Sequence, residues 1–273
     1  MSFVDLHLHT RYSDGSWLPV DLCREAKRLG LAAIAVADHD TLDGVPAMLE
    51  AGQAAGLEVL PAVEITCRIE TRELHLLGYL PGDAWKNAAL QAVLAHSKQI
   101  RAKRIDAIVA RLNELGIALT TADVLACSDC GTLGRPHVAQ ALVKRGVVKT
   151  VDEGFERFLK RGKPGFVDRY RMDVAEAIGH VKRAGGVAVL AHPGLNKMDE
   201  HIPTMLQQGL GGLEAWHSRQ SPAQTEHYRQ LAAHYGLLVT GGSDCHGQMR
   251  GRALLGKVKV PVECLTALTA HAA

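Results

Sequence analysis

Short apolar segments alternate with amphipathic helical segments along most of this chain, and this alternation constrains the fold more than any other feature. Parallel β/α units produce such a pattern, because each strand needs a crossover helix before the next strand can pair beside it. The segments with the pattern of strands are residues 3–9, 32–38, 57–67, 73–80, 186–193, 212–218 and 237–244, with 256–260 as a candidate eighth. The expected helices between them lie at about 19–29, 45–55, 174–184, 202–208 and 223–235. A chain of 273 residues with seven such strands fits one α/β barrel that carries an insertion, or two small domains.

The middle of the chain breaks this alternation. Residues 98–167 have the pattern of helices throughout, and helices are expected at about 84–115, after Thr120, from Pro136 to Gly146, and at 151–159. Charge is also uneven, because residues 98–171 hold 15 Lys and Arg against 8 Asp and Glu, whereas the whole chain has a net charge of +2. The surplus fits either an anionic substrate or a solvated basic surface. We expect a helical cap domain at 98–167, inserted into a barrel domain formed by 1–97 and 168–273.

Composition and cysteine content predict a globular cytoplasmic protein. The hydrophobic fraction is 47% and the charged fraction is 22%, which is typical of a domain with a sizeable core. The first residues lack the features of a secretory signal, and the longest apolar stretch is far shorter than a membrane span. Six cysteines occur without a repeating framework, so reduced thiols are expected. Only Cys127 and Cys130 have the spacing of metal ligands, and without a second pair we interpret them as part of a loop.

Histidines gather at the ends of the predicted strands. In α/β barrels the carboxyl ends of the strands carry the chemistry, because the loops there are free to vary. Seven of the 14 histidines lie at or near such ends, together with several carboxylates. In VDLHLHT, period-two alternation sends His7 and His9 to the same side of one strand. A single histidine at a strand end is more often a hydrogen-bonded structural residue, but many such groups inside one barrel would stay unpaired unless metal ions satisfied them.

The candidate ligands are six histidines and three carboxylates: His7, His9, Asp14, His39, Glu64, His75, His192, Asp244 and His246. With about three protein ligands for each ion, and Glu64 shared between two ions, this set fits two or three metals. Imidazole and carboxylate ligands without thiolate suit Mn²⁺, Zn²⁺ or Fe²⁺ better than Ca²⁺ or Mg²⁺. We expect Mn²⁺ ahead of Zn²⁺ and Fe²⁺.

The motifs that contain these residues resemble the polymerase and histidinol phosphatase (PHP) family of metal-dependent phosphoesterases. The motifs are D-x-H-x-H at 5–9, the SDG turn, ADHD at 37–40, VEIT at 63–66, LHLLGY at 74–79, LAHP at 190–193 and GSDCHG at 242–247. The resemblance implies a distorted seven-stranded, TIM-like β/α barrel with a trinuclear metal centre. It implies three ligand sets: His7, His9, Glu64 and Asp244; Glu64, His75 and His192; Asp14, His39 and His246. Asp5 would orient a ligand histidine from outside these sets.

The middle segment resembles the helical insertion of bacterial PHP phosphoesterases that act on nucleotides, a group that includes 3′,5′-nucleoside bisphosphate phosphatase and a 5′-end-trimming ribonuclease. The matching stretches are GTLGRPHVAQALVKRG and FLKRGKPGFV. The resemblance implies that Arg135 reaches the substrate phosphate from the cap and that His217 faces it from the barrel. His137 and Lys163 are further candidates for substrate contact. Read without the resemblance, Arg135 is a surface cation and His217 a packed residue at a strand end.

We therefore predict a phosphomonoesterase, with three divalent ions per chain, that removes the 3′-phosphate of a 3′,5′-bisphosphonucleotide and leaves a nucleoside 5′-monophosphate. Its catalytic residues would be His217, Arg135 and Asp5. One alternative is a 5′ to 3′ exoribonuclease that acts on short RNA. A second is a non-catalytic nucleic-acid-binding or regulatory module, which low aromatic content (4%) and an unbroken ligand set disfavour. No membrane and no obligate protein partner are expected.

Overall fold

The computed structural model describes residues 2–128, 134–168, 171–247 and 254–271, and Cys130 of the CSDC loop lies outside them. The chain divides into two compact units, one formed by Met1–Leu94 with Arg171–Ala273 and the other by Ala95–Tyr170. The boundaries expected from the sequence were 97/98 and 167/168. Among the described residues, no helix is both long enough and apolar enough to cross a membrane.

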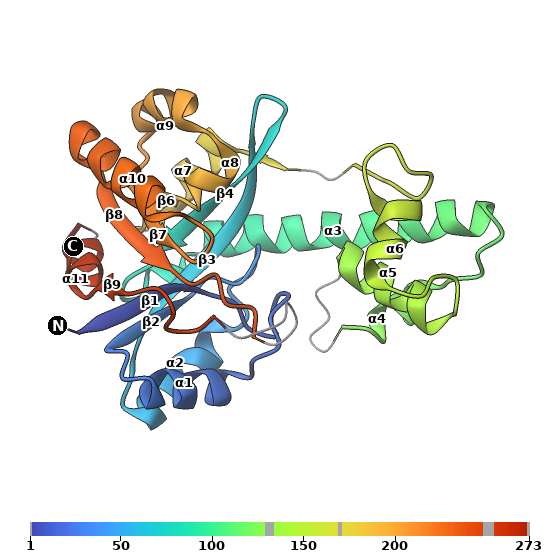
Figure 1. Cartoon of the computed structure of the whole chain (residues 1–273), viewed down its shortest axis with the longest axis horizontal. Helices are drawn as coiled ribbons and strands as arrows, with labels where there is room; N and C mark the ends of the chain where they lie inside the picture. Colours follow the sequence, from blue (N-terminus) through green and yellow to red (C-terminus); the bar gives the residue numbers. More distant parts are fainter. Residues whose placement is uncertain (1, 129–133, 169–170, 248–253, 272–273) are drawn as a thin grey trace. The chain divides into compact units, whose positions relative to one another are not determined.

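The first unit is built around one curved sheet (Figure 1). Its strands are β1 (Phe3–Leu8), β2 (Ala33–Val36), β3 (Glu58–Ile69), β4 (Arg72–Tyr79), β5 (Met172–Asp173), β6 (Val187–Leu190), β7 (Gly212–His217), β8 (Leu238–Gly242) and β9 (Val260–Pro261). They pair in the order β8-β7-β6-β4-β3-β2-β1-β9, and β5 adds to β3. The seven principal strands are those predicted, and β5 and β9 are short additions. The predicted barrel-like α/β fold is confirmed.

The strands are not all parallel. β1, β2 and β3 run parallel, as do β6, β7 and β8, but β4 is antiparallel to both β3 and β6. Only two residues separate β3 from β4, so the connection is a hairpin and no crossover helix can intervene. Our expectation that His75 lies near the carboxyl end of its strand was therefore wrong. His75 lies in the first half of β4, and it reaches the site because this strand enters from the opposite direction.

The two ends of the sheet meet through the segment after β8. Leu8 forms a parallel bridge with Cys245, the His9 amide donates to the Cys245 carbonyl, and the Asp244 amide donates to the His7 carbonyl. Gly242 allows this approach, because a Cβ atom at that position would lie 2.3 Å from the His7 backbone nitrogen. The sheet is thereby nearly closed into a barrel.

Helices cover the outside of the barrel. They are α1 (Pro19–Arg28), α2 (Val45–Ala55), α7 (Val174–Arg183), α8 (Pro193–Asn196), α9 (Ile202–Gln208), α10 (Pro222–Tyr235) and α11 (Glu263–His271), with 3₁₀ turns at Ala84–Lys86 and Asp199–His201. In α1 the apolar face packs Leu22 and Ala26 against Ile34 and Val36 of β2. The neighbouring alanines of β2 face a separate cluster with residues of β3, β4 and β6. Alternation along each strand thus separates an outer, helix-covered layer from the interior.

The second unit is helical. It contains most of α3 (Ala88–Glu114), then α4 (Thr121–Leu125), α5 (Arg135–Lys144) and α6 (Val151–Gly154), which continues as a π-helical turn at Phe155–Leu159. These helices share their own core, in which Ile108, Leu112 and Leu142 are fully buried. The single helix expected at 84–115 is interrupted at Asn87, because the Asn87 side chain accepts a hydrogen bond from the Leu90 amide and so begins a new helix.

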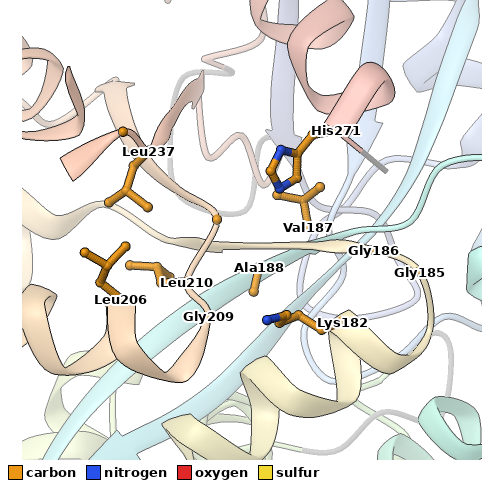
Figure 2. A pocket seen from close by; sticks show the side chains of 12 residues that line it. Lys182, Gly185, Gly186, Val187, Ala188, Leu206, Gly209, Leu210, Leu237 and His271 are labelled. Carbon is orange, nitrogen blue, oxygen red and sulfur yellow. The ribbon is translucent and has the colours of Figure 1, made fainter. Parts of the chain in front are cut away.

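A cavity of about 410 Å³ lies at the amino-terminal ends of β6 to β8 (Figure 2). Its lining includes Gly209 and Gly236 at the ends of α9 and α10, the start of β6, and Lys182 in the last turn of α7. Helix C-termini attract positive charge, and the Lys182 ammonium lies against Gly209, where a Cβ atom would be 2.4 Å from Nζ. The predicted ligand His192 follows the other end of β6, so this cavity is not part of the candidate site.

Candidate metal centre

A β-bulge in β1 decides which of its polar residues enter the site. Asp5 pairs with Ile34 and Leu8 pairs with Val36, so the register slips by one residue between them. Beyond the slip, His7 and His9 point to the barrel interior and are fully buried. Asp5 lies before it, and its carboxylate accepts hydrogen bonds from the backbone amides of Ser243 and Gly256. In this structure Asp5 therefore holds the loop that follows β8, whereas we expected it to orient a histidine ring.

A second bulge, in β7, turns Glu214 and His217 to the same side although they are three residues apart. Glu214 pairs with Thr240 and Trp216 pairs with Gly241, so one residue of β7 is extra. Glu214 is fully buried, and its Oε1 lies 2.9 Å from His7 Nδ1. Glu214 was not among the residues expected from the sequence. Strict alternation puts it and His217 on opposite sides of the strand, and the bulge has no signal in the sequence.

Glu64 lies at the centre of the site, and its two oxygens face different histidines. Oε2 is 3.3 Å from His7 Nε2, 3.2 Å from His9 Nε2 and 3.1 Å from a ring nitrogen of His39. Oε1 is 2.7 Å from His75 Nδ1 and 3.1 Å from the Nε2 of His192. This division matches the geometry that a carboxylate shared by two cations requires.

Asp14 and Asp244 complete two further sides of the site. Asp14 Oδ1 lies 3.1 Å from His246 Nε2 and 3.9 Å from His39 Nε2. Asp244 Oδ1 lies 3.1 Å from His9 Nε2. All nine predicted ligands are therefore brought together, and His39 stands between two of the expected sets because its two ring nitrogens face Glu64 and Asp14.

The donor set fits divalent metal ions. Two ligands, each about 2.1 Å from one ion in tetrahedral geometry, are about 3.4 Å apart, which is close to the separations of 3.1 to 3.3 Å around Glu64 Oε2. Within the described part of the chain, several buried atoms here have no hydrogen-bond partner: His7 Nε2, both ring nitrogens of His9, His39 Nδ1, Glu64 Oε2 and His246 Nε2. Buried polar atoms rarely stay unsatisfied unless they serve a ligand. The candidate ion-binding groups are His9, Asp14, His39 and His246; His7, His9 and Glu64; His39, Glu64 and His75. A fourth group with such spacing, His7, Glu214 and His217, already contains the hydrogen bond between His7 Nδ1 and Glu214 Oε1.

The backbone is strained where the site residues leave their strands. His192 has φ 33° and Asp244 has φ 53°, both in the left-handed region that non-glycine residues seldom adopt. Each such residue costs on the order of 1–3 kcal/mol and persists only where the surroundings enforce it. The Glu214 carboxylate accepts from the His192 amide at 2.7 Å, and the Asp244 amide donates to the His7 carbonyl. The fold thus holds both side chains in positions that relaxed turns would not give.

Histidine protons balance the carboxylates when no metal is present. Burial lowers the pKa of His9, but Asp244 and Glu64 outweigh this effect and raise it to about 10. Burial raises the pKa of Glu64, yet the nearby histidines, led by His39, bring it well below its ordinary value. His39 itself behaves in the opposite way to His9, since burial lowers its pKa to about 3. Metal ions that enter this site must displace protons from some of its histidines.

The partner of Nδ1 fixes the hydrogen position on three rings. His7 Nδ1 faces the Glu214 carboxylate and His246 Nδ1 lies 2.9 Å from the Asp244 carbonyl, both of which only accept hydrogen bonds. Nδ1 of these rings therefore carries the hydrogen, so Nε2 offers a lone pair when the ring is neutral. His217 is different, because its Nδ1 accepts from the Arg219 amide at 3.1 Å. Its Nε2 then carries the hydrogen, 3.4 Å from Asp244 Oδ2, and in this tautomer it can donate a hydrogen bond but cannot bind a cation.

The predicted residues of the cap have partners within their own unit. The Arg135 guanidinium donates to the Leu159 carbonyl and lies about 6 Å from the ring centres of Phe155 (5.8 Å) and Phe166 (6.0 Å). His137 is buried, and its Nδ1 accepts from the Gly134 amide at the start of α5. The side chain of Lys163 is exposed. Contact of these residues with a substrate stays a prediction.

Comparison with known proteins identifies the family. The PHP domain family matches residues 5–164. A 3′,5′-nucleoside bisphosphate phosphatase of Chromobacterium violaceum is 30% identical, with 92% of this chain and 90% of the relative covered. A 5′-3′ exoribonuclease of Haemophilus influenzae is 32% identical with 89% of each covered, and a phosphoribosyl 1,2-cyclic phosphate 1,2-diphosphodiesterase of Eggerthella lenta is 31% identical with 89% and 94% covered. The names of these relatives share phosphoester hydrolysis and differ in substrate.

A solved structure agrees over nearly the whole chain. It is a protein of Bifidobacterium adolescentis, whose assignment as a metal-dependent phosphoesterase is itself a prediction. The two chains superpose with a TM-score of 0.87 at 34% identity, covering 99% of this chain and 96% of the other. The family match, the relatives and the cluster of His and carboxylate ligands agree, and the chain belongs to the PHP family of metal-dependent phosphoester hydrolases.

Proposed function

We propose that this enzyme removes the 3′-phosphate of a 3′,5′-bisphosphonucleotide, such as adenosine 3′,5′-bisphosphate, and releases a nucleoside 5′-monophosphate and phosphate. The observation that carries the proposal is the pairing of a complete ligand cluster around Glu64 with a separate histidine, His217, whose Nε2 hydrogen faces that cluster. The relative of Chromobacterium violaceum, named for this reaction, supports the substrate.

The metal ligands would be the nine residues expected from the sequence, with Glu64 shared between two ions. The ions supply positive charge for the phosphoryl oxygens and an activated water at neutral pH when they are bound. The chain's own residues supply position. Glu64 is 1% exposed and His7 is fully buried, so bulk water has little access to the centre of the cluster. We propose three ions per chain, with Mn²⁺ favoured.

His217 would act on the substrate directly. Its Nε2–H can donate a hydrogen bond to a phosphoryl oxygen, or to the leaving 3′-oxygen, while the Arg219 amide keeps the ring in this tautomer. We propose that Arg135 binds the second phosphate of the substrate, with His137 and Lys163 as further contacts. Arg135 suits this role because a guanidinium that already packs on aromatic rings binds phosphate with less loss of side-chain freedom.

A 5′ to 3′ exoribonuclease is the second candidate, and the 32% identity to the Haemophilus influenzae enzyme favours it. Both reactions would hold a nucleotide 5′-phosphate and hydrolyse a phosphate ester on its 3′ side. The leaving 3′-oxygen is the same in both. They differ in the phosphate that is attacked, which is terminal in one reaction and bonded to the next nucleoside in the other. We keep short RNA as an alternative substrate.

Product analysis separates the two candidates. Mn²⁺-loaded enzyme of measured metal content would be given adenosine 3′,5′-bisphosphate, adenosine 3′-phosphate, adenosine 5′-phosphate, and a 5′-phosphorylated trinucleotide. We expect phosphate release to be fastest from the bisphosphate, with a kcat/KM at least tenfold above that of the other compounds. Faster release of mononucleotides from the trinucleotide would overturn the proposal in favour of the exoribonuclease.

The cytoplasmic location expected from the sequence stays a prediction.

A further inference from the structure

Glu214 contacts two of the proposed ligands at once, although it belongs to none of the ligand sets expected from the sequence. Its Oε1 lies 2.9 Å from Nδ1 of His7, and its Oε2 accepts from the backbone amide of His192 at 2.7 Å. His7 comes from β1 and His192 follows β6, and the two are expected to bind different ions that share Glu64. Both oxygens of one fully buried carboxylate are thereby committed to protein donors.

We propose that Glu214 is a positioning residue that sets the ligand state of His7 and the backbone position of His192, and so couples two metal sites through β7. Because an ionised carboxylate only accepts hydrogen bonds, Nδ1 of His7 must carry a hydrogen. When the ring is neutral, as metal binding requires, its lone pair is therefore on Nε2, which lies 3.3 Å from Glu64 Oε2. The second oxygen holds the amide of His192, whose φ of 33° would otherwise relax.

Replacing the Glu214 carboxylate by an amide tests this positioning role, because it changes a single acceptor oxygen into a donor. The substitution Glu214→Gln keeps the shape of the side chain but offers one acceptor and one NH₂ group. The His192 backbone amide cannot become an acceptor, so the new side-chain oxygen is expected to stay there and the NH₂ group to face His7. His7 would then accept at Nδ1 and carry its hydrogen on Nε2, which removes the lone pair that binds metal.

The experiment compares Glu214→Gln with the wild type and with Glu58→Gln, an exposed glutamate at the start of β3. Calorimetry with Mn²⁺ and metal analysis after dialysis give affinity and stoichiometry, and NMR of ¹⁵N-histidine protein loaded with Zn²⁺ gives the ring state of His7. His246 is an internal control, because its Nδ1 partner is a backbone carbonyl that the substitution does not touch. The His7 signals are assigned with a His7→Gln variant.

For Glu214→Gln we expect a loss of about 10- to 100-fold in Mn²⁺ affinity, as is typical when the partner of a ligand histidine is removed. The His7 hydrogen should move from Nδ1 to Nε2, while His246 and the Glu58→Gln variant stay as in the wild type. A folded Glu214→Gln protein that binds the same number of ions within twofold of the wild-type affinity, with His7 still protonated at Nδ1, overturns the proposal.

A second variant keeps the test decisive if Glu214→Gln does not fold, as judged by circular dichroism. Glu214→Asp retains both acceptors but retracts them by one methylene group, so the carboxylate can reach one donor and not both. Unchanged metal affinity in a folded Glu214→Asp protein would also contradict the inference. The inference rests on the proposed ligand set and not on the nucleotide, so a wild-type enzyme that binds metals as expected but rejects the bisphosphate would refute the proposed function alone.

Discussion

At the scale of single residues, the group that faces Nδ1 decides what each histidine can do. The Nδ1 atoms of His7 and His246 face acceptors, so their neutral rings offer Nε2 as a lone pair, whereas Nδ1 of His217 faces the Arg219 amide and its neutral ring offers Nε2–H. One residue type can therefore supply both ligands and donors within a single cluster.

Replacement of His217 should remove activity and leave the metals in place. For His217→Ala we expect kcat/KM to fall by about 100-fold, since one positioned hydrogen-bond donor to the charge that develops in the transition state contributes about 10²–10³-fold. The metal content should not change, because Nε2 of this ring carries a hydrogen. Phosphate release and metal analysis on the same sample check this, and a His217→Ala protein that has lost one ion per chain would instead make this residue a ligand.

Replacement of Glu64, unlike replacement of His217, should weaken metal binding. In Glu64→Gln one carboxylate oxygen becomes an NH₂ group, which cannot bind a cation. This holds for either orientation of the amide, because one oxygen faces His9 and the other faces His75. We expect Mn²⁺ affinity to fall by more than about 100-fold, beyond the loss typical of residues outside the ligand set. Equilibrium dialysis measures the affinity, with Glu58→Gln on the same strand as the matched control. If this variant keeps its full metal content, Glu64 is not a metal ligand.

At the scale of elements, the sequence predicted the strands well and their local irregularities poorly. All seven principal strands were expected, because each combines an apolar run with turn signals at its ends. The bulges in β1 and β7 were not, since they depend on how each strand pairs with a neighbour distant in sequence. The alternation that places His7 and His9 on the same side depends only on local sequence and could be predicted. The hydrogen bonds of Asp5 and the presence of Glu214 in the site depend on the bulges and could not be predicted.

The closure of the barrel between β8 and β1 gives a prediction at this scale. In Gly242→Ala the new Cβ atom would lie 2.3 Å from the His7 backbone nitrogen, so the two strands must separate. We expect a loss of about 1–3 kcal/mol in unfolding free energy, the usual cost of overpacking, together with weaker metal binding because His7 moves. Urea denaturation in EDTA and Mn²⁺ titration measure the two effects.

Gly179→Ala is the control for that substitution. Gly179 lies inside α7, and its new Cβ atom would meet only the mobile end of the Arg183 side chain, at 2.9 Å. Alanine inside a helix is favoured over glycine by about 0.5–1 kcal/mol, so this variant should be at least as stable as the wild type. Equal stability of the Gly242→Ala and Gly179→Ala proteins would mean that the contact between β8 and β1 is not tight.

At the scale of the whole molecule, we expect the site to make stability fall with rising pH when metal is absent and not when metal is bound. The pKa of His9 is about 10 in the metal-free protein against about 6.5 in an unfolded chain, so between these values the folded state keeps a proton that the unfolded state loses. The pKa of His7 is also raised, since Glu214 and Glu64 outweigh the effect of burial. A raised pKa stabilises fully below about 6.5, and this contribution is lost as the pH rises towards 10.

Between about pH 6.5 and 8.5 we therefore expect the unfolding free energy of the EDTA-treated protein to fall, by up to about 1.4 kcal/mol per pH unit for each proton retained. Other shifted groups do not oppose this slope, because the lowered pKa of His39 (about 3) acts below 6.5 and the raised pKa of the Cys23 thiol (about 11) acts above the window. With Mn²⁺ at a fixed free concentration the slope should be flat or positive, since the ions replace those protons and bind more tightly as pH rises. Urea denaturation at three pH values, with EDTA and with Mn²⁺, measures both slopes. Parallel slopes under the two conditions would mean that the histidines of the barrel do not exchange protons for metal.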